Sequence, residues 1–288
     1  MMPNNASHFE KPIENYIEVI NPSYDRGHFR FALFDFDGTL SLIREGWQKI
    51  MKGYFLEELQ KAPGAQNEGA EALKACIDEL VDGLTGKQTI YQCIALAEEI
   101  ARRGGKPLDP QAYKDEYSRR LMAEISGRIR GLEDGTIDPL SLTVPGGDQI
   151  LPALRARDVS IFIASGTDEI YAAHEAELLG VTGYLAAQVY GAQRDYKSFS
   201  KKMIVERIIR ENGLTGAELV GFGDGFVEIE NVKEAGGFAV GVATDEKNHD
   251  GRVDQWKRER LIRAGADIII PDFSNVPALI NYLFPKMD

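Results

Sequence analysis

Two aspartates, Asp35 and Asp37, stand where a nearly continuous apolar and aromatic stretch, residues 29–36, gives way to Gly38. Such a stretch predicts a strand that is buried on both faces. Residues two apart on a strand point to the same side, so both carboxylates would face one spot at its carboxyl end. Because like charges repel, the pair indicates a bound cation or a carboxyl group that keeps its proton. Taken alone, the stretch fits a simple Asp-Gly turn equally well.

A hydroxyl-rich turn, Ser165-Gly166-Thr167, ends a second apolar run and opens a helix predicted over residues 168–179. Free N–H groups at a helix amino terminus attract anions, so this turn could hold a phosphate group. The simpler interpretation is that Ser165 or Thr167 caps the helix.

Acidic residues follow a third apolar run, with Asp224 at its end and Glu228 four positions later. Together with Asp35 they could form a Mg²⁺ site, because Mg²⁺ prefers a few carboxylate oxygens with water and phosphate. Alone, they would be ordinary acids at a helix start, where the helix dipole favours negative charge. Lys201 and Lys202 open another predicted helix, where positive charge opposes the dipole and invites a functional explanation.

The chain shows two kinds of sequence pattern. From about residue 42 to 143, apolar residues recur at three- and four-residue steps, which predicts four or five amphipathic helices. From residue 144 onward, short apolar runs alternate with helical stretches, which indicates β-α repeats and a parallel sheet. The simplest architecture is an α/β core interrupted by an all-helical insertion. Because ligands bind beyond the carboxyl ends of such strands, the insertion would cover the two aspartates.

Composition excludes several classes of protein. The 288-residue chain has a net charge of -12, which argues against a nucleic-acid partner. Cys76 and Cys93 show neither metal-ligand spacing nor a disulfide framework, which fits a reducing cytoplasm. We expect no signal peptide and no membrane partner, because no run approaches transmembrane length. The sequence gives no indication of the oligomeric state.

In chain order, FDFDGTL, IASGT, a lysine that opens a helix, and GFGDGFVE resemble the four motifs of the haloacid dehalogenase-like superfamily. The spacing to Asp224 favours Lys201 as the third-motif lysine over Lys197 and Lys202. Glu228 stands where many relatives have Asp. The resemblance implies a Rossmann-like core at residues 28–41 and 144–288, with helices on both faces of the sheet. It also implies a C1-type helical cap at residues 42–143, behind an N-terminal extension at residues 1–27.

The resemblance implies a Mg²⁺-dependent phosphatase that hydrolyses a small phosphorylated metabolite through an aspartyl-phosphate. Asp35 would be the nucleophile, and Asp37 would protonate the leaving group and then activate water. Lys201 would offset the negative charge on Asp35 and the phosphate. The implied phosphate ligands are Ser165, the N–H of Gly166 and Lys201. The implied metal ligands are Asp35, the backbone carbonyl of Asp37, Asp224 and Glu228.

The cap and the segment that leads into it would select the leaving group. Arg44 and Trp47 follow the first motif closely enough to reach the site, and Lys87 and Gln88 lie in a turn before a predicted helix. For all four residues, an ordinary surface role is an equally good interpretation.

Other activities share the same motifs. A phosphomutase of the β-phosphoglucomutase type is the main alternative. A phosphonatase would need a cap lysine, for which Lys87 is only a distant candidate. A non-catalytic phosphometabolite-binding protein is the alternative of a different class, and the intact set of motif residues argues against it.

Overall fold

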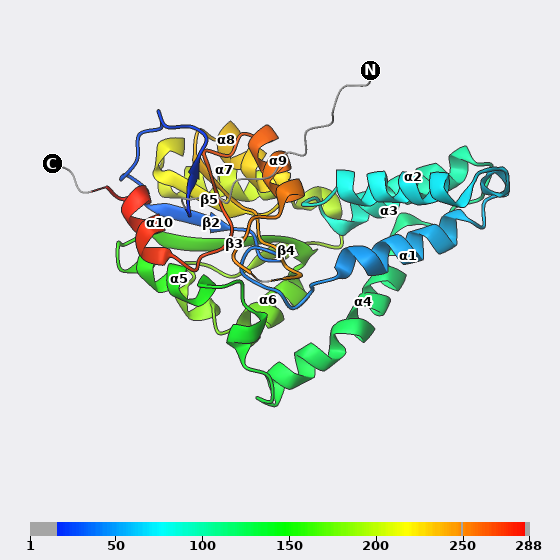
Figure 1. The fold of residues 1–288 in the computed structure, drawn as a ribbon, viewed down its shortest axis with the longest axis horizontal. Coiled ribbons are helices and arrows are strands. Elements are labelled where there is room, and N and C mark those ends of the chain that lie inside the picture. The colour runs from blue at the N-terminus through cyan, green and yellow to red at the C-terminus, as the bar shows by residue number, and fades with distance from the viewer. Residues whose placement is uncertain (1–15, 249, 286–288) are drawn as a thin grey trace, which may run out of the picture.

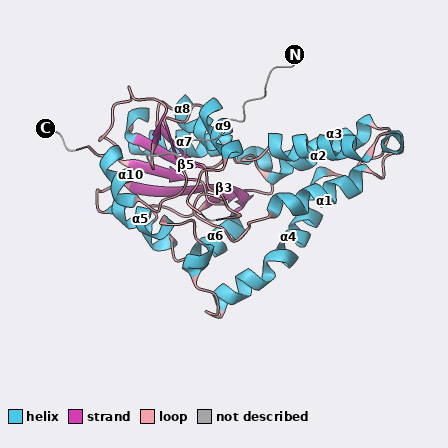
Figure 2. Ribbon diagram, viewed as in Figure 1, coloured by secondary structure: helices cyan, strands magenta, loops and turns pink. Residues whose placement is uncertain are grey.

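The computed structural model describes residues 16–248 and 250–285. Its centre is a seven-stranded sheet with the order β1-β7-β6-β5-β2-β3-β4 (Figures 1 and 2). All neighbouring strands are parallel except the pair of β1 and β7. The strands are β1 (Glu18–Val19), β2 (Phe31–Phe34), β3 (Ser160–Asp168), β4 (Tyr190–Ala192), β5 (Leu219–Gly223), β6 (Phe238–Val242) and β7 (Ile268–Ile270).

Strand β2 lies in the middle of the sheet and is buried on both faces, as its apolar sequence predicts. Its alternate residues enter two separate hydrophobic clusters. Ala32 and Phe34 pack in the cluster that includes α5, α6 and α10, whereas Phe31 and Leu33 pack in the cluster that includes α7, α8 and α9. These helices are α5 (Gly147–Arg155), α6 (Glu169–Leu178), α7 (Lys201–Asn212), α8 (Phe226–Glu234), α9 (Gln255–Arg263) and α10 (Val276–Leu283).

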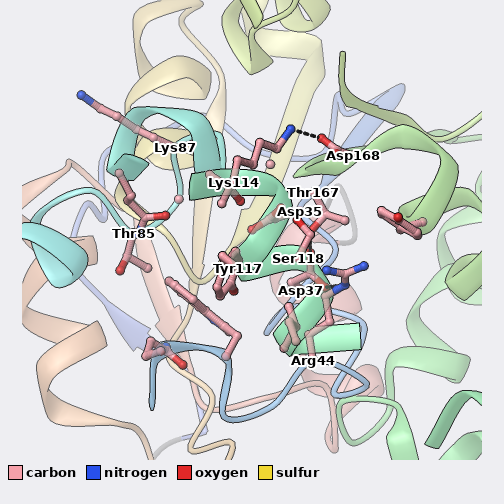
Figure 3. A pocket seen from close by; sticks show the side chains of 18 of the residues that line it. Asp35, Asp37, Arg44, Thr85, Lys87, Lys114, Tyr117, Ser118, Thr167 and Asp168 are labelled. Carbon is pink, nitrogen blue, oxygen red and sulfur yellow. Dashed lines mark hydrogen bonds and ion pairs between the residues drawn. The ribbon is translucent and has the colours of Figure 1, made fainter. Parts of the chain in front are cut away.

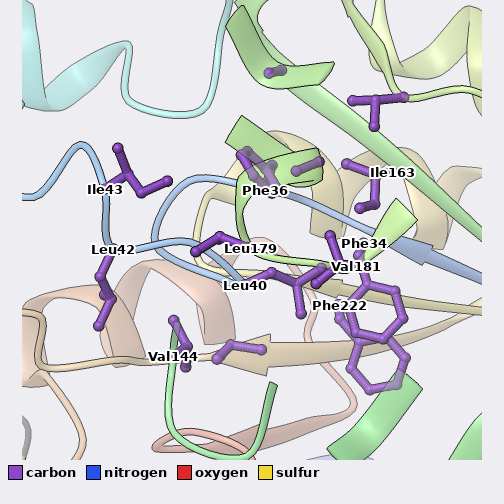
Figure 4. Close-up of a cluster of buried hydrophobic side chains, with 14 of the residues drawn as sticks. Phe34, Phe36, Leu40, Leu42, Ile43, Val144, Ile163, Leu179, Val181 and Phe222 are labelled. Carbon is purple, nitrogen blue, oxygen red and sulfur yellow. The ribbon is translucent and has the colours of Figure 1, made fainter. Parts of the chain in front are cut away.

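The first cluster continues along the chain directly into the acidic motif. Phe34 stacks on Phe222 of β5 with ring centroids 4.4 Å apart (Figure 4). Phe36 and Leu40, on either side of Asp37, are fully buried in the same cluster. The backbone around the two aspartates is therefore fixed by packing, and the predicted α/β fold with helices on both faces of the sheet is confirmed.

Four helices between β2 and α5 extend from the side of the sheet where the parallel strands end (Figure 1). They are α1 (Trp47–Leu59), α2 (Ala70–Gly83), α3 (Thr89–Arg102) and α4 (Pro110–Glu133). The sequence periodicity identifies their buried faces, for example Met51, Phe55 and Leu59 of α1. Helix α4 starts at Pro110 because Asp109 caps it by accepting a hydrogen bond from the N–H of Gln111.

The start of the described chain forms the edge of the sheet. Strand β1, within the YIEVI segment, pairs antiparallel with β7. Residues 1–15 of the predicted N-terminal extension lie outside the described part of the chain. None of the helices in the described residues combines the length and apolar composition needed to span a bilayer.

Candidate active site

Asp35 lies one residue beyond β2 and is only 5% exposed. Its N–H donates to the carbonyl of Phe222, which extends the pairing of β2 with β5 by one residue. Lys201 Nζ donates to Asp35 Oδ1 at 2.8 Å. The lysine reaches this position because Ser200 caps α7, accepting from the N–H of Met203, so that α7 begins at Lys201.

Of the three candidate lysines for the third motif, the structure brings Lys201 to the acidic pair. Lys202 forms an exposed ion pair with Glu234, and Lys197 lies near the ring of Tyr196. The motif spacing therefore selected the lysine that contacts Asp35.

Burial raises the pKa of Asp35 to about 7, Lys201 opposes this rise, and the negative charges of Asp224 and Asp37 add to it. Two carboxylates of the first motif and one from the end of β5 thus lie close enough to affect one another. Such a cluster is electrostatically unfavourable unless cations offset it.

The carboxylate of Asp37 is held through one of its two oxygens. Oδ2 accepts hydrogen bonds from Ser165 Oγ at 3.1 Å and from Thr167 Oγ1 at 2.9 Å. Ser165 Oγ itself accepts from the N–H of Thr167. Both hydroxyls come from the end of β3, which continues to Asp168, so the SGT segment is strand rather than the predicted turn, and its hydroxyls hold Asp37. Oδ1 is buried and accepts no hydrogen bond from the described residues.

Gly38 allows Asp224 to approach the first motif. Its φ of +77° is a left-handed conformation, and a Cβ atom there would lie 2.3 Å from Asp224 Oδ2. The N–H of Asp224 donates to Thr39 Oγ1 at 3.0 Å. The order Asp-Gly-Thr in the first motif is thus explained by contacts: glycine gives the space, and threonine fixes the end of β5.

Lys257, which the sequence does not single out, contacts Asp224 and joins it to Glu246. Lys257 Nζ donates to Asp224 Oδ2 at 2.7 Å and to Glu246 Oε1 at 2.6 Å, and this lysine is only 6% exposed. Burial raises the pKa of Glu246. No sequence signal identifies these residues, because α9 brings Lys257 back from 33 positions further along the chain.

Glu228 lies in the first turn of α8 and is 3% exposed. Its Oε1 forms an ion pair with Lys201, whereas its Oε2 accepts no hydrogen bond from the described residues. Lys201 therefore joins two acids, Asp35 and Glu228, that come from opposite ends of the motif series.

The donor set fits Mg²⁺ on its chemistry. Asp35 and Asp224 supply hard carboxylate oxygens, and the charge of Asp224 is close enough to raise the pKa of Asp35. Among the described residues, no three His, Cys, Asp or Glu side chains are grouped to enclose a metal by themselves. Mg²⁺ in proteins commonly takes one or two carboxylate ligands, with waters and substrate phosphate as the others.

A cavity of about 90 Å³ lies between the strand ends and the inserted helices, and it contains the acidic pair (Figure 3). The core contributes Asp35, Asp37, Gly166, Lys201 and Asp224 to its wall. The inserted helices and their turns contribute Gln48, Thr85, Thr89, Gln92, Tyr117 and Ser118. The insertion therefore forms the wall opposite the carboxylates.

The four expected substrate residues have different surroundings. Trp47 and the exposed Lys87 line the cavity. Arg44 also lines it, but its guanidinium is bonded to Glu175. Gln88 does not line the cavity: its amide donates to the carbonyls of Tyr196 and Phe199 and so ties the insertion to the core.

A buried lysine, Lys114 of α4, crosses the cavity to form an ion pair with Asp168 at the start of α6 (Figure 3). Both residues line the cavity, and Lys114 is only 5% exposed. The sequence analysis did not identify them, because helical periodicity shows which face of a helix is apolar but not which residue meets it. The pair links the insertion to the residue that follows the SGT segment.

We expect Lys114→Met and Asp168→Asn to be energetically coupled by about 1 kcal/mol, since residues in direct contact usually couple by about 0.5–3 kcal/mol. Urea unfolding of the two single variants and the double variant measures this value. A coupling free energy indistinguishable from zero would show that solvent screens the pair.

Comparison with known proteins agrees with this geometry. Residues 29–236 match the model of the haloacid dehalogenase-like hydrolase family. No curated protein sequence matches the chain significantly.

Solved structures share the fold at low sequence identity. A predicted phosphatase from Clostridium acetobutylicum is 17% identical with a TM-score of 0.58, over 90% of this chain and 99% of that chain. β-Phosphoglucomutase from Clostridium difficile is 11% identical with a TM-score of 0.58, over 90% and 100%. A predicted phosphoglycolate phosphatase from Haemophilus somnus is 14% identical with a TM-score of 0.56, over 88% and 98%.

Proposed function

The chain belongs to the haloacid dehalogenase-like hydrolase family, and we propose that it is a phosphatase that hydrolyses a small phosphorylated metabolite through an aspartyl-phosphate on Asp35. The observation that carries this proposal is the arrangement of the two acids. Asp35 is buried against Lys201, whereas Asp37 keeps one carboxylate oxygen free of hydrogen bonds. Two neighbouring acids in such different surroundings suit two different chemical roles.

In this proposal, residues 42–143 act as a C1-type cap over a core made of residues 28–41 and 144–288. The cavity wall formed by the inserted helices supports that role. The contacts of Gln88 and Lys114 with the core would hold the cap over the substrate. A closed cap excludes water, which strengthens the electrostatic interactions inside the site.

Asp35 attacks in the first step. One of its carboxylate oxygens bonds to phosphorus, the bond from phosphorus to the leaving oxygen breaks, and Asp37 gives its proton to that oxygen. Lys201 offsets the negative charge of Asp35 and of the phosphate. The N–H of Gly166, which belongs to a cavity-lining residue, would hold a phosphate oxygen. Ser165, the other expected phosphate ligand, is fully buried, and its hydroxyl donates to Asp37 Oδ2 in the structure.

Water completes the reaction in the second step. Asp37, now ionised, takes a proton from water, and the water oxygen bonds to phosphorus as the bond to Asp35 breaks. Free phosphate and the starting carboxylate are restored. Because Oδ1 of Asp37 is buried, Oδ2, which the two hydroxyls orient, would make both proton transfers.

Mg²⁺ would be held by Asp35, the backbone carbonyl of Asp37 and Asp224, with Glu228 supporting the ion or its waters. When bound, it supplies positive charge that stabilises the phosphoryl group in the transition state. Lys257 would hold Asp224 in place through Oδ2.

The cavity wall opposite Asp35 favours a neutral, hydroxyl-bearing leaving group, such as a sugar or polyol, over an acid. Hydroxyl and amide side chains form much of that wall. The buried cations of the cavity already have carboxylate partners: Arg44 pairs with Glu175, Lys114 with Asp168, and Lys201 with Asp35 and Glu228. Among the described basic residues that line the cavity, only the exposed Lys87 has no such carboxylate partner and is left for a second anionic group on the substrate.

The test is phosphate release from a panel of phosphorylated metabolites, with Mg²⁺ and with excess chelator. We expect Mg²⁺-dependent release, with kcat/KM about tenfold or more higher for sugar and polyol phosphates than for phosphorylated carboxylic acids of similar size. Absence of release across the whole panel would favour the non-catalytic binding protein. Isomerised sugar phosphate without free phosphate would favour the phosphomutase.

A further inference from the structure

Arg44 lies between two acids, Asp37 and Glu175, at the edge of the cavity. Its Nε is 3.7 Å from Asp37 Oδ1, and its Nη2 donates to Glu175 Oε1 at 2.7 Å. Nε also donates to Glu175 Oε2 at 3.0 Å, so the contact with Glu175 is bidentate. Figure 3 shows Arg44 beside Asp37 in the cavity wall.

The ion pair of Arg44 with Glu175 is almost completely enclosed. Arg44 is 9% exposed and Glu175 is 1% exposed. Burial removes water from both charges, and apolar residues of similar size often stabilise a fold as well as a buried ion pair does. A buried Arg-Glu pair beside Asp35 and Asp37 therefore indicates a role other than stabilising the fold.

Glu175 also limits what Arg44 can do for a substrate. The bidentate contact uses the Nε and Nη2 edge of the guanidinium, and the ring of Tyr171 lies 5.7 Å from its central carbon. An arginine held in this way is preorganised, and its charge is already balanced. The expected role of Arg44 in selecting the leaving group is therefore restricted, and its other charged neighbour is Asp37.

The two oxygens of Asp37 have different surroundings. Hydroxyl groups of Ser165 and Thr167 hold Oδ2, whereas Oδ1 faces Arg44 at a distance too long for a hydrogen bond. The charge of Arg44 attracts Oδ1 without occupying its lone pairs. The carboxylate is thus held at both ends, which fixes the orientation of Oδ2, the oxygen left to exchange a proton because Oδ1 is buried.

We propose that Arg44, held in place by Glu175, is a positioning residue that orients Asp37 for proton transfer to the leaving group. The inference rests on the proposed phosphatase function and assigns Arg44 and Glu175 a role within it. Neither residue need touch the substrate. Their effect should therefore depend on how much the leaving group needs a proton.

The experiment compares two substrates in the full-length protein with Mg²⁺. 4-Nitrophenyl phosphate releases a stable anion that needs little protonation, whereas glycerol 3-phosphate releases an alkoxide that needs a full proton. For Arg44→Met and for Glu175→Gln, we expect kcat/KM to fall about 10- to 100-fold with glycerol 3-phosphate, because misplacing a general acid forfeits part of its contribution. With 4-nitrophenyl phosphate we expect a loss of about threefold or less.

A double-mutant cycle with Asp37→Asn separates positioning from substrate binding. If Arg44 acts through Asp37, then Arg44→Met should lower kcat/KM for glycerol 3-phosphate by less than about threefold in the Asp37→Asn background. If Arg44 instead bound the substrate, Arg44→Met would lower kcat/KM by the same factor in both backgrounds. Equal losses on the two substrates, or an undiminished loss in the Asp37→Asn background, would overturn the proposal.

Arg103→Met is the matched control. The Arg103 side chain is 12% exposed, close to the 10% of Arg44, and it pairs with Glu68 and Glu99 within the inserted helices. Arg103→Met should change kcat/KM by the same factor for both substrates. If the unaltered protein releases phosphate from neither substrate, the proposed function fails, whereas uniform losses in an active enzyme reject only the role of Arg44.

Discussion

Asp35→Asn is expected to lower phosphate release at least about a thousandfold, because an amide oxygen cannot replace the attacking carboxylate. The substitution changes one atom and keeps the shape of the side chain. Lys201 retains its ion pair with Glu228, so the site should stay assembled. Steady-state phosphate release on the best substrate of the panel measures the effect.

The fold of Asp35→Asn should survive for an electrostatic reason. Burial raises the pKa of Asp35 to about 7, so the folded protein binds the proton more tightly than the unfolded chain does. Ionised Asp35 therefore destabilises the metal-free fold increasingly as pH rises from about 4 towards 7. At pH 8 without metal, the variant should melt at or above the wild-type Tm.

Asp138→Asn is a suitable control for this substitution. Asp138 is an exposed capping residue of the turn after α4, and asparagine caps equally well. The control should keep full activity. If folded Asp35→Asn protein turned over at more than about a tenth of the wild-type rate, the assignment of Asp35 as the nucleophile would be refuted.

Asp37→Asn should lower steady-state turnover by about 10²- to 10⁴-fold, the usual contribution of a general acid and base. The amide oxygen can still accept hydrogen bonds from Ser165 and Thr167, so the local structure should persist. With 4-nitrophenyl phosphate, Asp35 can still be phosphorylated, because this leaving group needs no proton. The phosphorylated enzyme should then hydrolyse slowly, because asparagine cannot activate water.

Rapid mixing of Asp37→Asn with 4-nitrophenyl phosphate therefore tests the division of roles. We expect a burst of about one nitrophenolate per active site, followed by slow turnover. Slow release without a burst would assign Asp37 to the phosphorylation step alone. Turnover close to the wild-type rate would exclude Asp37 as the proton carrier.

The sequence predicted those parts of the protein that depend on local pattern. Residues 31–34 are apolar without alternation, and β2 is buried on both faces in the middle of the sheet. The spacing of the motifs singled out Lys201, which contacts Asp35 in the structure. These predictions succeed because strand burial and the positions of strand ends follow from short stretches of chain.

Contacts between distant segments could not be predicted in this way. Glu175 looks like one more polar residue of α6, yet it is 1% exposed because Arg44 arrives from a segment 131 positions earlier. Lys257 reaches Asp224 only through the placement of α9 against the sheet. Gln88 was a candidate for contacting the substrate, but its amide instead donates to the carbonyls of Tyr196 and Phe199. A single sequence shows which face of a helix is apolar, but it does not show which distant residues contact the helix.

The central claim is that the phosphoryl group passes through Asp35. The direct measurement is peptide mapping by mass spectrometry of Asp37→Asn protein that has been mixed with 4-nitrophenyl phosphate and quenched in acid, with Asp35→Asn treated in the same way. The account predicts one phosphoryl group on the peptide that contains Asp35, at Asp35 itself, and none in the Asp35→Asn protein. A phosphoryl group on another residue, or an unmodified Asp35 in protein that has released a burst of nitrophenolate, would contradict it.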